Sequence, residues 1–250
     1  VRDGIILVEN SNSGTANHLD VGSIPERVKL SPLRKAIAVR MTEAKRSIPH
    51  FRVLADIEMD EVLTLRKEIN AQRTDIKVSV NDFIVKACAL ALVEWPIINS
   101  HFCDNETLQF PHADISIVVS IDDGLTIPVL RMADTKTVED IADELADMTF
   151  RAGHGKLKMS EIRGGSFTIS NMGMYGVDQF DAIINPPQVA ILAASGAKKK
   201  VVVVDNRAVI RTVMRVTLSV DHRAVDGAVG AGFLASLSTY LENPKILLSE

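Results

Sequence analysis

A histidine stands between a strand-like run and a helix-like run near the end of this 250-residue chain. The run 213–220 is rich in apolar and β-branched residues, and His222 follows it within the segment DHRAVDG. Imidazole has the side-chain pKa nearest neutrality, so a histidine on such a junction can move protons. The alternative is structural: Asp226, followed by Gly227, would form a helix N-cap, and His222 would be a solvated loop residue.

A second candidate for chemistry is the segment GGSFTISNMGMYG at 164–176, a short β-prone run followed by asparagine and glycines. Thr168 and Ser170 share one face of the expected strand, so its polar end can present a hydroxyl to a cleft. The sequence lacks the GxSxG elbow, and no histidine lies near Ser170 along the chain, so spacing gives no argument for a nucleophilic serine. The alternative is that both hydroxyls only face solvent on an edge strand.

The composition narrows the class of protein. The chain is 46% hydrophobic and 24% charged with net charge −4, which is typical of soluble globular domains and not of nucleic-acid binders. Aromatic residues make up only 4%, too few to suggest a base-stacking surface. Cys88 lies in an apolar helical pattern, and no CxxC pair occurs, so neither a metal site nor a disulfide framework is indicated. Two such cysteines fit a reducing compartment, and the apolar runs are too short to cross a bilayer.

Helices and strands are mixed along the chain without strict alternation or repeats. Helices are expected from Ser31 to before Pro49, from Asp60 to about Asn70, from Asn81 to about Trp95, after a Thr137–Asp140 capping pair, and from Asp226 to about Leu241. Strands are expected at 51–59, 114–121, 125–131, 166–171, 188–195, 201–204 and 213–220. This order predicts an α/β fold, a two-layer sandwich with a mixed β-sheet.

One boundary is visible near the start of the chain. Residues 9–31 are rich in serine, asparagine and glycine and lack periodic apolar positions. We therefore expect residues 1–26 to be an N-terminal arm or linker remnant and residues 27–250 to form one catalytic domain. The chain starts with Val1 and shows no signal-peptide pattern, so it could be a fragment of a longer protein.

Six segments together resemble one family across residues 27–250, in the family's order. They are SPLRKAIAVRMTEAKRSIPHF, VSVNDFIVKACALAL, DDGLTIPVLR, GGSFTISNMGMYG, IINPPQVAIL and DHRAVDG. The chain resembles the catalytic core of the dihydrolipoamide acyltransferases, the E2 components of 2-oxo acid dehydrogenase complexes. It is most similar to the pyruvate dehydrogenase acetyltransferases, and the resemblance implies a chloramphenicol-acetyltransferase-like fold.

The resemblance implies a transfer of an acetyl group from S-acetyldihydrolipoamide to coenzyme A. His222 would act as the base on the coenzyme A thiol, which is mostly protonated at neutral pH. Ser170 would stabilise the oxyanion of the tetrahedral intermediate rather than act as a nucleophile. Asp226 would either tune His222 or be structural, with Arg34 as its ion-pair partner.

The resemblance also implies which residues contact the substrates and which partners the protein has. Contacts to coenzyme A are expected from four residues, namely Arg66, Ser79, Asp122 and Asn171, each with a helix-charge, capping or turn role as its alternative. No lipoyl-carrying Asp-Lys-Ala motif is present, so no cofactor is expected to be covalently bound here; the lipoyl group and coenzyme A are substrates. The expected partners are two further copies in a homotrimer, a cubic or icosahedral core built from trimers, and a lipoyl domain, E1 and E3 through upstream regions, with no nucleic acid or membrane.

Alternatives to this function stay open. One is a different acyltransferase on the same fold, such as an antibiotic acetyltransferase or an E2 for branched-chain or succinyl groups, which share the histidine motif. Acyl choice depends on pocket volume, and one methylene changes substrate discrimination by only about 1–3 kcal/mol. The other alternative is a non-catalytic structural core subunit, a kind of relative that loses the histidine. The expected compartment is the bacterial cytoplasm or the mitochondrial matrix.

Overall fold

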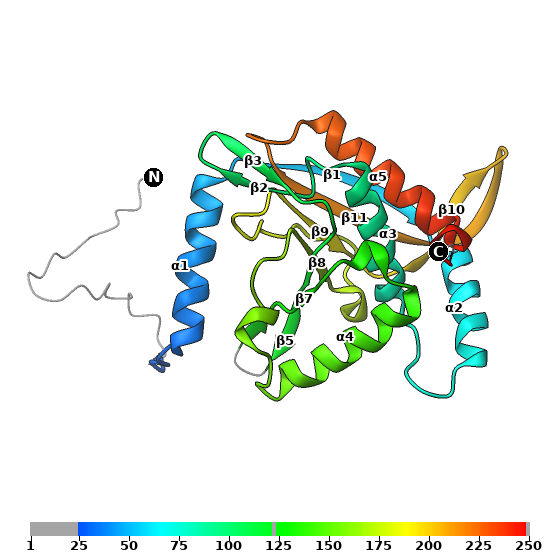
Figure 1. The fold of residues 1–250 in the computed structure, drawn as a ribbon. Coiled ribbons are helices and arrows are strands. Elements are labelled where there is room, and N and C mark those ends of the chain that lie inside the picture. Colours follow the sequence, from blue (N-terminus) through cyan, green and yellow to red (C-terminus); the bar gives the residue numbers. More distant parts are fainter. Residues whose placement is uncertain (1–24, 122–123, 249–250) are drawn as a thin grey trace, which may run out of the picture. The chain divides into compact units, whose positions relative to one another are not determined.

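The computed structural model describes residues 25–121 and 124–248 (Figure 1). The chain divides into a first unit, Val1–Leu30, and a compact unit, Ser31–Glu250. In the first unit the described residues 25–30 are exposed and carry no helix or strand. Almost all of the expected arm, residues 1–26, lies outside the described residues, so its boundary stays a prediction.

The compact unit contains five α-helices among its described residues. They are α1 (Pro32–Ser47), α2 (Asp60–Gln72), α3 (Val80–Glu94), α4 (Val138–Gly153) and α5 (Gly227–Glu242). Local capping chemistry sets several of these ends: the Ser31 side chain accepts a hydrogen bond from Arg34 N at 3.1 Å, and Thr137 and Asp140 form the expected capping box. Short 3₁₀ turns follow at Ala133–Thr135, Met159–Glu161, Gly173–Tyr175 and Pro244–Leu248.

Two expected helix starts were wrong by one or two residues. Asp60 is the first helical residue of α2 rather than its cap, and its carboxylate accepts hydrogen bonds from Thr212 N and Oγ1 at 2.9 and 3.0 Å. Helix α3 is capped by Ser79 and not by Asn81, because Ser79 N donates to Asp82 Oδ2 at 2.6 Å. Asn81 lies inside the first turn, where its side chain is used for another contact.

A mixed sheet forms the centre of the unit. Its described strands run in the order β1 (His50–Glu58), β11 (Arg207–Asp221), β9 (Ala190–Ala194), β8 (Phe167–Asn171), β4 (Ile115–Ile117) and β7 (Val129–Leu130). A further strand, β10 (Lys198–Val204), pairs with β11. The neighbours β9, β8 and β4 are parallel and the other pairings antiparallel, which confirms the expected mixed sheet.

Two small hairpins stand outside this sheet. The pair β2 (Ser100–Cys103) and β3 (Glu106–Gln109) was not expected from the sequence. Its turn includes Asp104 at φ 52°, a left-handed conformation that aspartate tolerates better than most residues. The pair β5 (Val119–Ile121) and β6 (Gly124–Thr126) splits the strands expected at 114–121 and 125–131. Each expected strand therefore serves the sheet with one part and a hairpin with the other.

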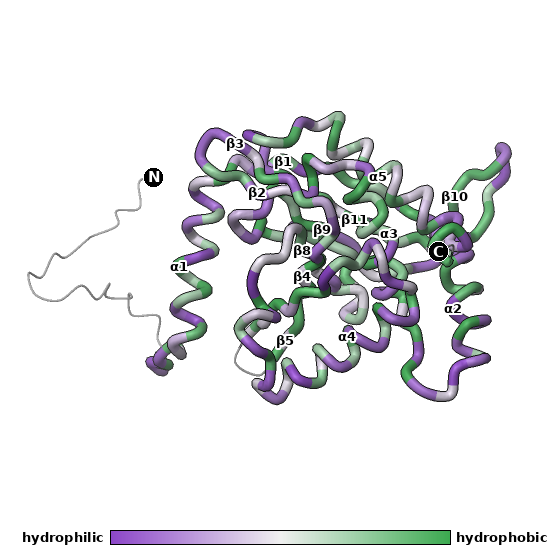
Figure 2. Tube along the Cα trace, in the orientation of Figure 1, coloured by the Kyte–Doolittle hydropathy of each residue, from purple (hydrophilic) through white to green (hydrophobic). Residues whose placement is uncertain are grey.

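The two faces of the sheet are covered differently. In β9, Leu192 belongs to the main core together with residues of α3 and α5, whereas Ile191 packs with Ala44 and Ile48 at the end of α1. Successive strand residues point to opposite faces, so the C-terminal end of α1 packs on the face opposite α3 and α5, while most of α1 is exposed (Figure 1). Figure 2 shows hydrophobic stretches along the central strands.

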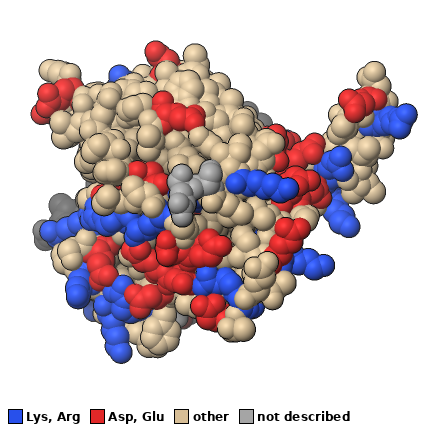
Figure 3. All heavy atoms as spheres, turned by 45° about the vertical axis from the view of Figure 1, so that its right-hand side comes forward, with Lys and Arg blue, Asp and Glu red and all other residues tan. Residues whose placement is uncertain are grey.

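The ribbon made by β10 and the first half of β11 projects from the rest of the unit (Figure 3). Val201 pairs with Ile210 across it, and the two side chains are 71% and 67% exposed. On the face seen in Figure 3, acidic and basic side chains are interspersed. Cys88 is fully buried, and burial raises the pKa of its thiol, as expected for an unreactive core cysteine. Within the described residues, the helices are too short or too polar to span a bilayer.

The core makes a prediction about stability. Phe233 is fully buried on α5, with its ring centroid 5.7 Å from that of Phe167 on β8, so it joins the helix layer to the sheet. We expect Phe233→Ala to lower the free energy of unfolding by about 3–5 kcal/mol in thermal or denaturant unfolding. Phe150→Ala is the matched control, because Phe150 is 63% exposed on α4 and its loss should change stability little. Equal effects of the two variants would contradict this core assignment.

Candidate functional site

His222 lies where β11 ends and is held by Pro49, just before β1, and by Phe51 in β1. Its backbone N donates to Pro49 O at 3.1 Å, and its ring meets the ring of Phe51 edge-on, with centroids 4.8 Å apart. The side chain is exposed. The structure therefore places an accessible imidazole on a fixed strand end, as a proton-transfer group requires.

The residues on either side of His222 form a clamp that the sequence analysis missed. Asp221 is only 1% exposed, and both its oxygens accept hydrogen bonds from Arg223, with Nε–Oδ1 at 3.0 Å and Nη2–Oδ2 at 2.7 Å. Arg223 also lies 4.2 Å above the centroid of the Phe102 ring. The hydrogen bonds to Asp221 raise the pKa of Arg223, and the bidentate contact fixes the turn that carries His222. The sequence did contain a signal for this pair, because an aspartate and an arginine directly flank His222.

Ser170 does not meet His222 within one chain. It lies near the end of β8 in register with Ala193 of β9, which is in register with Thr217 of β11. His222 is five residues further along from Thr217, so the two side chains are separated by roughly 17 Å along the strands and by two strand spacings of about 5 Å each. The structure therefore places the candidate base and the candidate oxyanion donor at different positions on the sheet.

Asp226 and Arg34 are also apart within one chain. Asp226 is the N-cap residue of α5, but its side chain makes no capping hydrogen bond. Arg34 lies next to Gly124, with Nη2 3.6 Å from the point that a Cβ there would occupy. No ion pair joins them among the described residues. The expected partnership stays a prediction, and a single chain does not supply it.

Three of the four residues expected to contact coenzyme A gather at one place. Arg66 Nε donates to Val78 O at 2.9 Å, which brings the guanidinium beside Ser79. Ser79 and Asn171 both line a cavity of about 600 Å³. Asn171 is fixed from two sides, since its Nδ2 donates to Asn81 Oδ1 at 3.0 Å and its Oδ1 accepts from Gly173 N at 2.8 Å. Asp122 lies outside the described residues.

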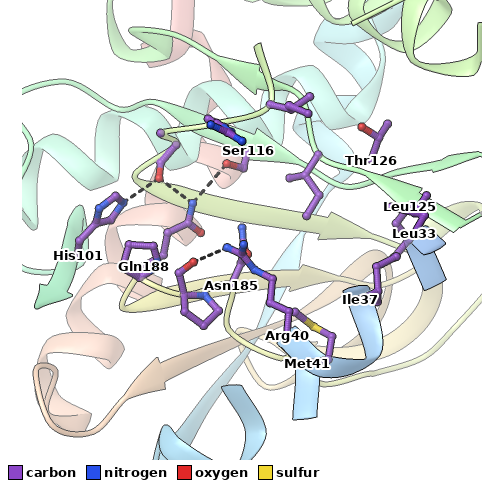
Figure 4. A pocket seen from close by; sticks show the side chains of 17 residues that line it. Leu33, Ile37, Arg40, Met41, His101, Ser116, Leu125, Thr126, Asn185 and Gln188 are labelled. Atoms are coloured by element: carbon purple, nitrogen blue, oxygen red, sulfur yellow. Dashed lines mark hydrogen bonds between the residues drawn. The ribbon is translucent and has the colours of Figure 1, made fainter. Parts of the chain in front are cut away.

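A second cavity of about 630 Å³ lies between α1 and the sheet (Figure 4). Helix α1 contributes three apolar side chains, Leu33, Ile37 and Met41, and the guanidinium of Arg40. Its floor is polar and buried: Gln188 Nε2 donates to Gly165 O at 2.8 Å, and His101 Nε2 lies 2.9 Å from the same oxygen. These floor residues come from separate parts of the chain, and sequence reasoning missed them.

The floor of this cavity is a closed hydrogen-bond network. Thr168 donates to Gln188 Oε1, and Gln188 Nε2 also lies 3.3 Å from Ser116 Oγ. All three side chains are at least 97% buried, so the network is rigid rather than solvated. The Thr168 hydroxyl thus faces the interior, whereas the alternative reading had it facing solvent. Within the described ranges, no cluster of acidic, histidine or cysteine side chains could hold a metal ion.

Comparisons with known proteins support one family. Residues 23–249 match the model of the 2-oxoacid dehydrogenases acyltransferase (catalytic domain). The chain is 41% identical over 249 residues to the dihydrolipoyllysine-residue acetyltransferase component of the pyruvate dehydrogenase complex of Rickettsia bellii. That alignment covers 97% of this chain and 60% of the relative's length. The chain thus spans less than two thirds of that protein.

Comparison with solved structures supports the same family. The dihydrolipoamide acetyltransferase of Azotobacter vinelandii is 30% identical with a TM-score of 0.87, over 90% of this chain and 95% of that one. The cubic core of a pyruvate dehydrogenase multienzyme complex matches at 29% identity and TM-score 0.87, with the same coverage. A chloramphenicol acetyltransferase matches at 13% identity and TM-score 0.55, over 81% of this chain and 94% of that one, which confirms the expected fold.

The Azotobacter enzyme offers one further comparison. Its structural and enzymatic investigation concerned the roles of a serine, a histidine and an asparagine in the catalytic mechanism. In that protein the histidine follows the serine by 52 positions, and the asparagine follows the histidine by four.

The Asp221–Arg223 pair leads to a testable prediction about stability. Asp221→Asn keeps the shape of the side chain but removes the charge that Arg223 binds. We therefore expect the free energy of unfolding to fall by about 1–3 kcal/mol. The estimate lies below that for a fully buried ion pair because Arg223 is 40% exposed and partly hydrated. Thermal unfolding measures the effect. Asp178→Asn is the control, since Asp178 is 81% exposed in its ion pair with Lys198. An Asp221→Asn protein as stable as this control would show that the clamp contributes nothing.

Proposed function

Since the chain belongs to the family of 2-oxoacid dehydrogenase acyltransferase catalytic domains, we propose that it transfers an acetyl group from S-acetyldihydrolipoamide to coenzyme A. The lipoyl arm would be carried by another domain, and the reaction would serve a pyruvate dehydrogenase complex. The observation that carries the proposal is a spacing. Ser170, His222 and Asp226 are separated by 52 and four positions, the same intervals as the serine, histidine and asparagine of the Azotobacter enzyme.

The proposed reaction is a thioester exchange between two sulfur atoms. His222 takes the proton from the coenzyme A thiol, and the thiolate attacks the carbonyl carbon of the acetyl group. The Ser170 hydroxyl donates a hydrogen bond to the oxygen that becomes negative in the tetrahedral intermediate. The carbon–sulfur bond to the lipoyl group then breaks, and His222 returns its proton to the departing sulfur. No covalent bond to the protein is formed.

The separation of Ser170 from His222 supports a site shared between two chains. Within one chain they are too far apart to act on the same carbonyl, so a second copy supplies the missing group in this proposal. A homotrimer closes such contacts by threefold symmetry. The similarity to a cubic core supports an assembly of many chains, and the exposed Val201–Ile210 pair provides apolar surface that assembly could cover.

The cavity lined by Ser79 and Asn171 is the proposed coenzyme A subsite, with Arg66 close by to meet a phosphate. The role of Asp226 is proposed at the same shared site, because among the described residues its side chain makes no capping hydrogen bond and no ion pair. An asparagine at the corresponding interval in the Azotobacter enzyme indicates that a negative charge is not required there. The bacterial cytoplasm or the mitochondrial matrix stays the predicted compartment, and the lipoyl domain, E1 and E3 stay predicted partners.

Acyl specificity needs a direct test, because the alternative substrates differ by little. Transfer rates from acetyl-, isobutyryl- and succinyl-dihydrolipoamide to coenzyme A should be compared at equal concentrations. A clear preference for the acetyl donor supports the proposal. Preference for another donor would correct the specificity, and the absence of transfer with all three would favour a structural core subunit.

Catalytic variants test the two roles separately. We expect His222→Ala to lose several orders of magnitude in kcat while the protein stays folded, because no other base is proposed. Ser170→Ala should lower kcat by about 10²–10³ with little change in the KM for coenzyme A, as the loss of one oxyanion donor does. His154→Ala is the matched control, because His154 is the exposed C-cap residue of α4. Near-normal turnover in His222→Ala would refute the mechanism, and a pure KM effect would make Ser170 a binding residue.

Mixed assemblies test the shared site. Each inactive variant keeps one intact half of the site, so co-assembly of His222→Ala with Ser170→Ala chains should restore activity at some interfaces. Steady-state assays before and after dissociation and reassembly measure the recovery. Assemblies that stay inactive although mass measurements show mixed chains would mean that both residues act within one chain.

A further inference from the structure

The ring of His50 uses both its nitrogens to bind backbone groups. Nδ1 lies 2.9 Å from Ile48 O, and Nε2 accepts a hydrogen bond from Ile184 N at 3.1 Å. A carbonyl oxygen only accepts, so Nδ1 carries a hydrogen; an amide N–H only donates, so Nε2 carries none. The arrangement therefore requires a neutral ring in one defined tautomer, unlike His101, His112 and His154, each of which can donate from its bonded ring nitrogen in either charge state.

His50 lies directly between the two residues that contact His222. Pro49 supplies the carbonyl that binds His222 N, and Phe51 supplies the ring that meets the His222 ring. His50 itself pairs with Asp221 in the β1–β11 ladder. Side chains alternate along a strand, so Phe51 lies on the side of α5, next to Gly227, while His50 points to the opposite face, toward Ile184.

The segment bound by His50 forms a wall of the cavity in Figure 4. Ile184 is fully buried, and the next four residues, Asn185–Gln188, all line that cavity. Arg40 Nη2 binds the same segment, at 2.9 Å from Asn185 Oδ1 and 2.6 Å from Pro186 O. Two side chains from other elements thus hold this wall, His50 at its start and Arg40 in its middle, and its last residue, Gln188, is anchored in the buried floor network.

We propose that His50 is a positioning residue for the acyl transfer: its neutral ring ties the cavity wall that begins at Ile184 to the backbone that holds His222. This inference rests on the proposed function. Protonation of the ring puts a hydrogen on Nε2, directly opposite the Ile184 N–H. Two donors then face each other, the hydrogen bond is lost, and the wall is released at its start, while Arg40 still binds Asn185 and Pro186 and Gln188 stays in the floor network.

The surroundings of His50 oppose this protonation. Burial lowers its pKa below the ordinary value of 6.5, and Lys45 on α1 and Arg52 on β1 lower it further. The Ile48 carbonyl and Asp221 on β11 act in the opposite direction without reversing the shift. The unfolded chain binds this proton more readily than the folded one. The neutral His50 ring therefore stabilises the folded state fully above pH 6.5, and this stabilisation is lost as the pH falls below 6.5 through the lowered pKa of the folded state.

Two amide variants separate the two ring nitrogens. Glutamine places its amide at the distance of Nε2, so His50→Gln keeps an acceptor for Ile184 N and does not titrate. Asparagine places its amide at the distance of Nδ1, so His50→Asn keeps the donor to Ile48 O and loses the bond to Ile184. His154→Gln is the matched control, because its Nδ1 also lies near a backbone carbonyl, Phe150 O at 2.7 Å, on α4.

The first measurement is amide hydrogen exchange at Ile184 in the assembled protein, followed by mass spectrometry of overlapping peptides and expressed as protection relative to the free peptide. We expect protection in the wild type to fall roughly tenfold as the pH is lowered from 7.5 until the His50 ring is protonated, as the loss of about one hydrogen bond implies. His50→Gln should keep its protection across this range, and His50→Asn should lack it at every pH. Equal protection in all three proteins would overturn the inference.

The second measurement is the pH profile of kcat for acetyl transfer. Protonation of His50 adds an acidic loss of activity to the wild type, so its kcat should fall more steeply below pH 6.5 than that of His50→Gln, which lacks this titrating ring. His50→Asn should have a kcat reduced about tenfold even at pH 7.5, with His154→Gln unchanged. Identical profiles for wild type and His50→Gln would refute the positioning role. If no protein transfers acyl groups, the proposed function fails, and the exchange data still decide whether His50 holds the wall.

Discussion

The antiparallel pairing of β1 with β11 is the constraint on which the candidate site depends. Nine residue pairs, from His50–Asp221 to Glu58–Val213, fix the register of the two strands. A shift by one residue would turn every side chain to the other face of the sheet. The pairing delivers Pro49 and Phe51 to His222, and it aims the His50 ring at Ile184 on the other side. One ladder thus sets the environment of the candidate base on both faces.

Around this ladder, polar groups are buried only where other groups satisfy them. Asp221 is buried with Arg223 across two hydrogen bonds, and Gln188, Thr168 and Ser116 satisfy one another beneath the second cavity. Removing one partner from either arrangement is costly, because the remaining partner would be buried without a hydrogen bond. Both networks lie beside surfaces that must keep a fixed shape, the turn of His222 and the floor of the cavity. Among the described residues, two buried side-chain atoms lack a partner, Asn99 Oδ1 and Ser219 Oγ, and neither lines a cavity described above.

The sequence predicted what local chemistry decides. The capping box at Thr137, the proline start of α1 and the alternation in β1 and β11 are short-range patterns, and the mixed order of elements correctly indicated a mixed sheet. Motif resemblance predicted the family, because six segments agree in order. The cap of α3 was misplaced because Ser79 and Asn81 are both good capping residues and only the Asp82 contact distinguishes them.

What the sequence could not provide depends on register between distant strands. The distance between Ser170 and His222 follows from the pairing of β8, β9 and β11, which no local pattern encodes. The cavity floor joins residues 101, 116, 165 and 188, whose contacts arise only after the sheet has formed. The same holds for the Arg34 position beside Gly124, since two elements must be placed before that contact exists.

The distance between Ser170 and His222 has a consequence for how activity depends on concentration. If each chain carries two incomplete halves, an isolated chain has no functioning centre, and the number of centres follows the fraction of chains in contact. Turnover per chain would then fall on dilution with the dissociation constant of the contact, by mass action and without any change in the fold. A newly made chain would stay inert toward thioesters until it meets its neighbours, so assembly itself would act as the step that switches the chemistry on.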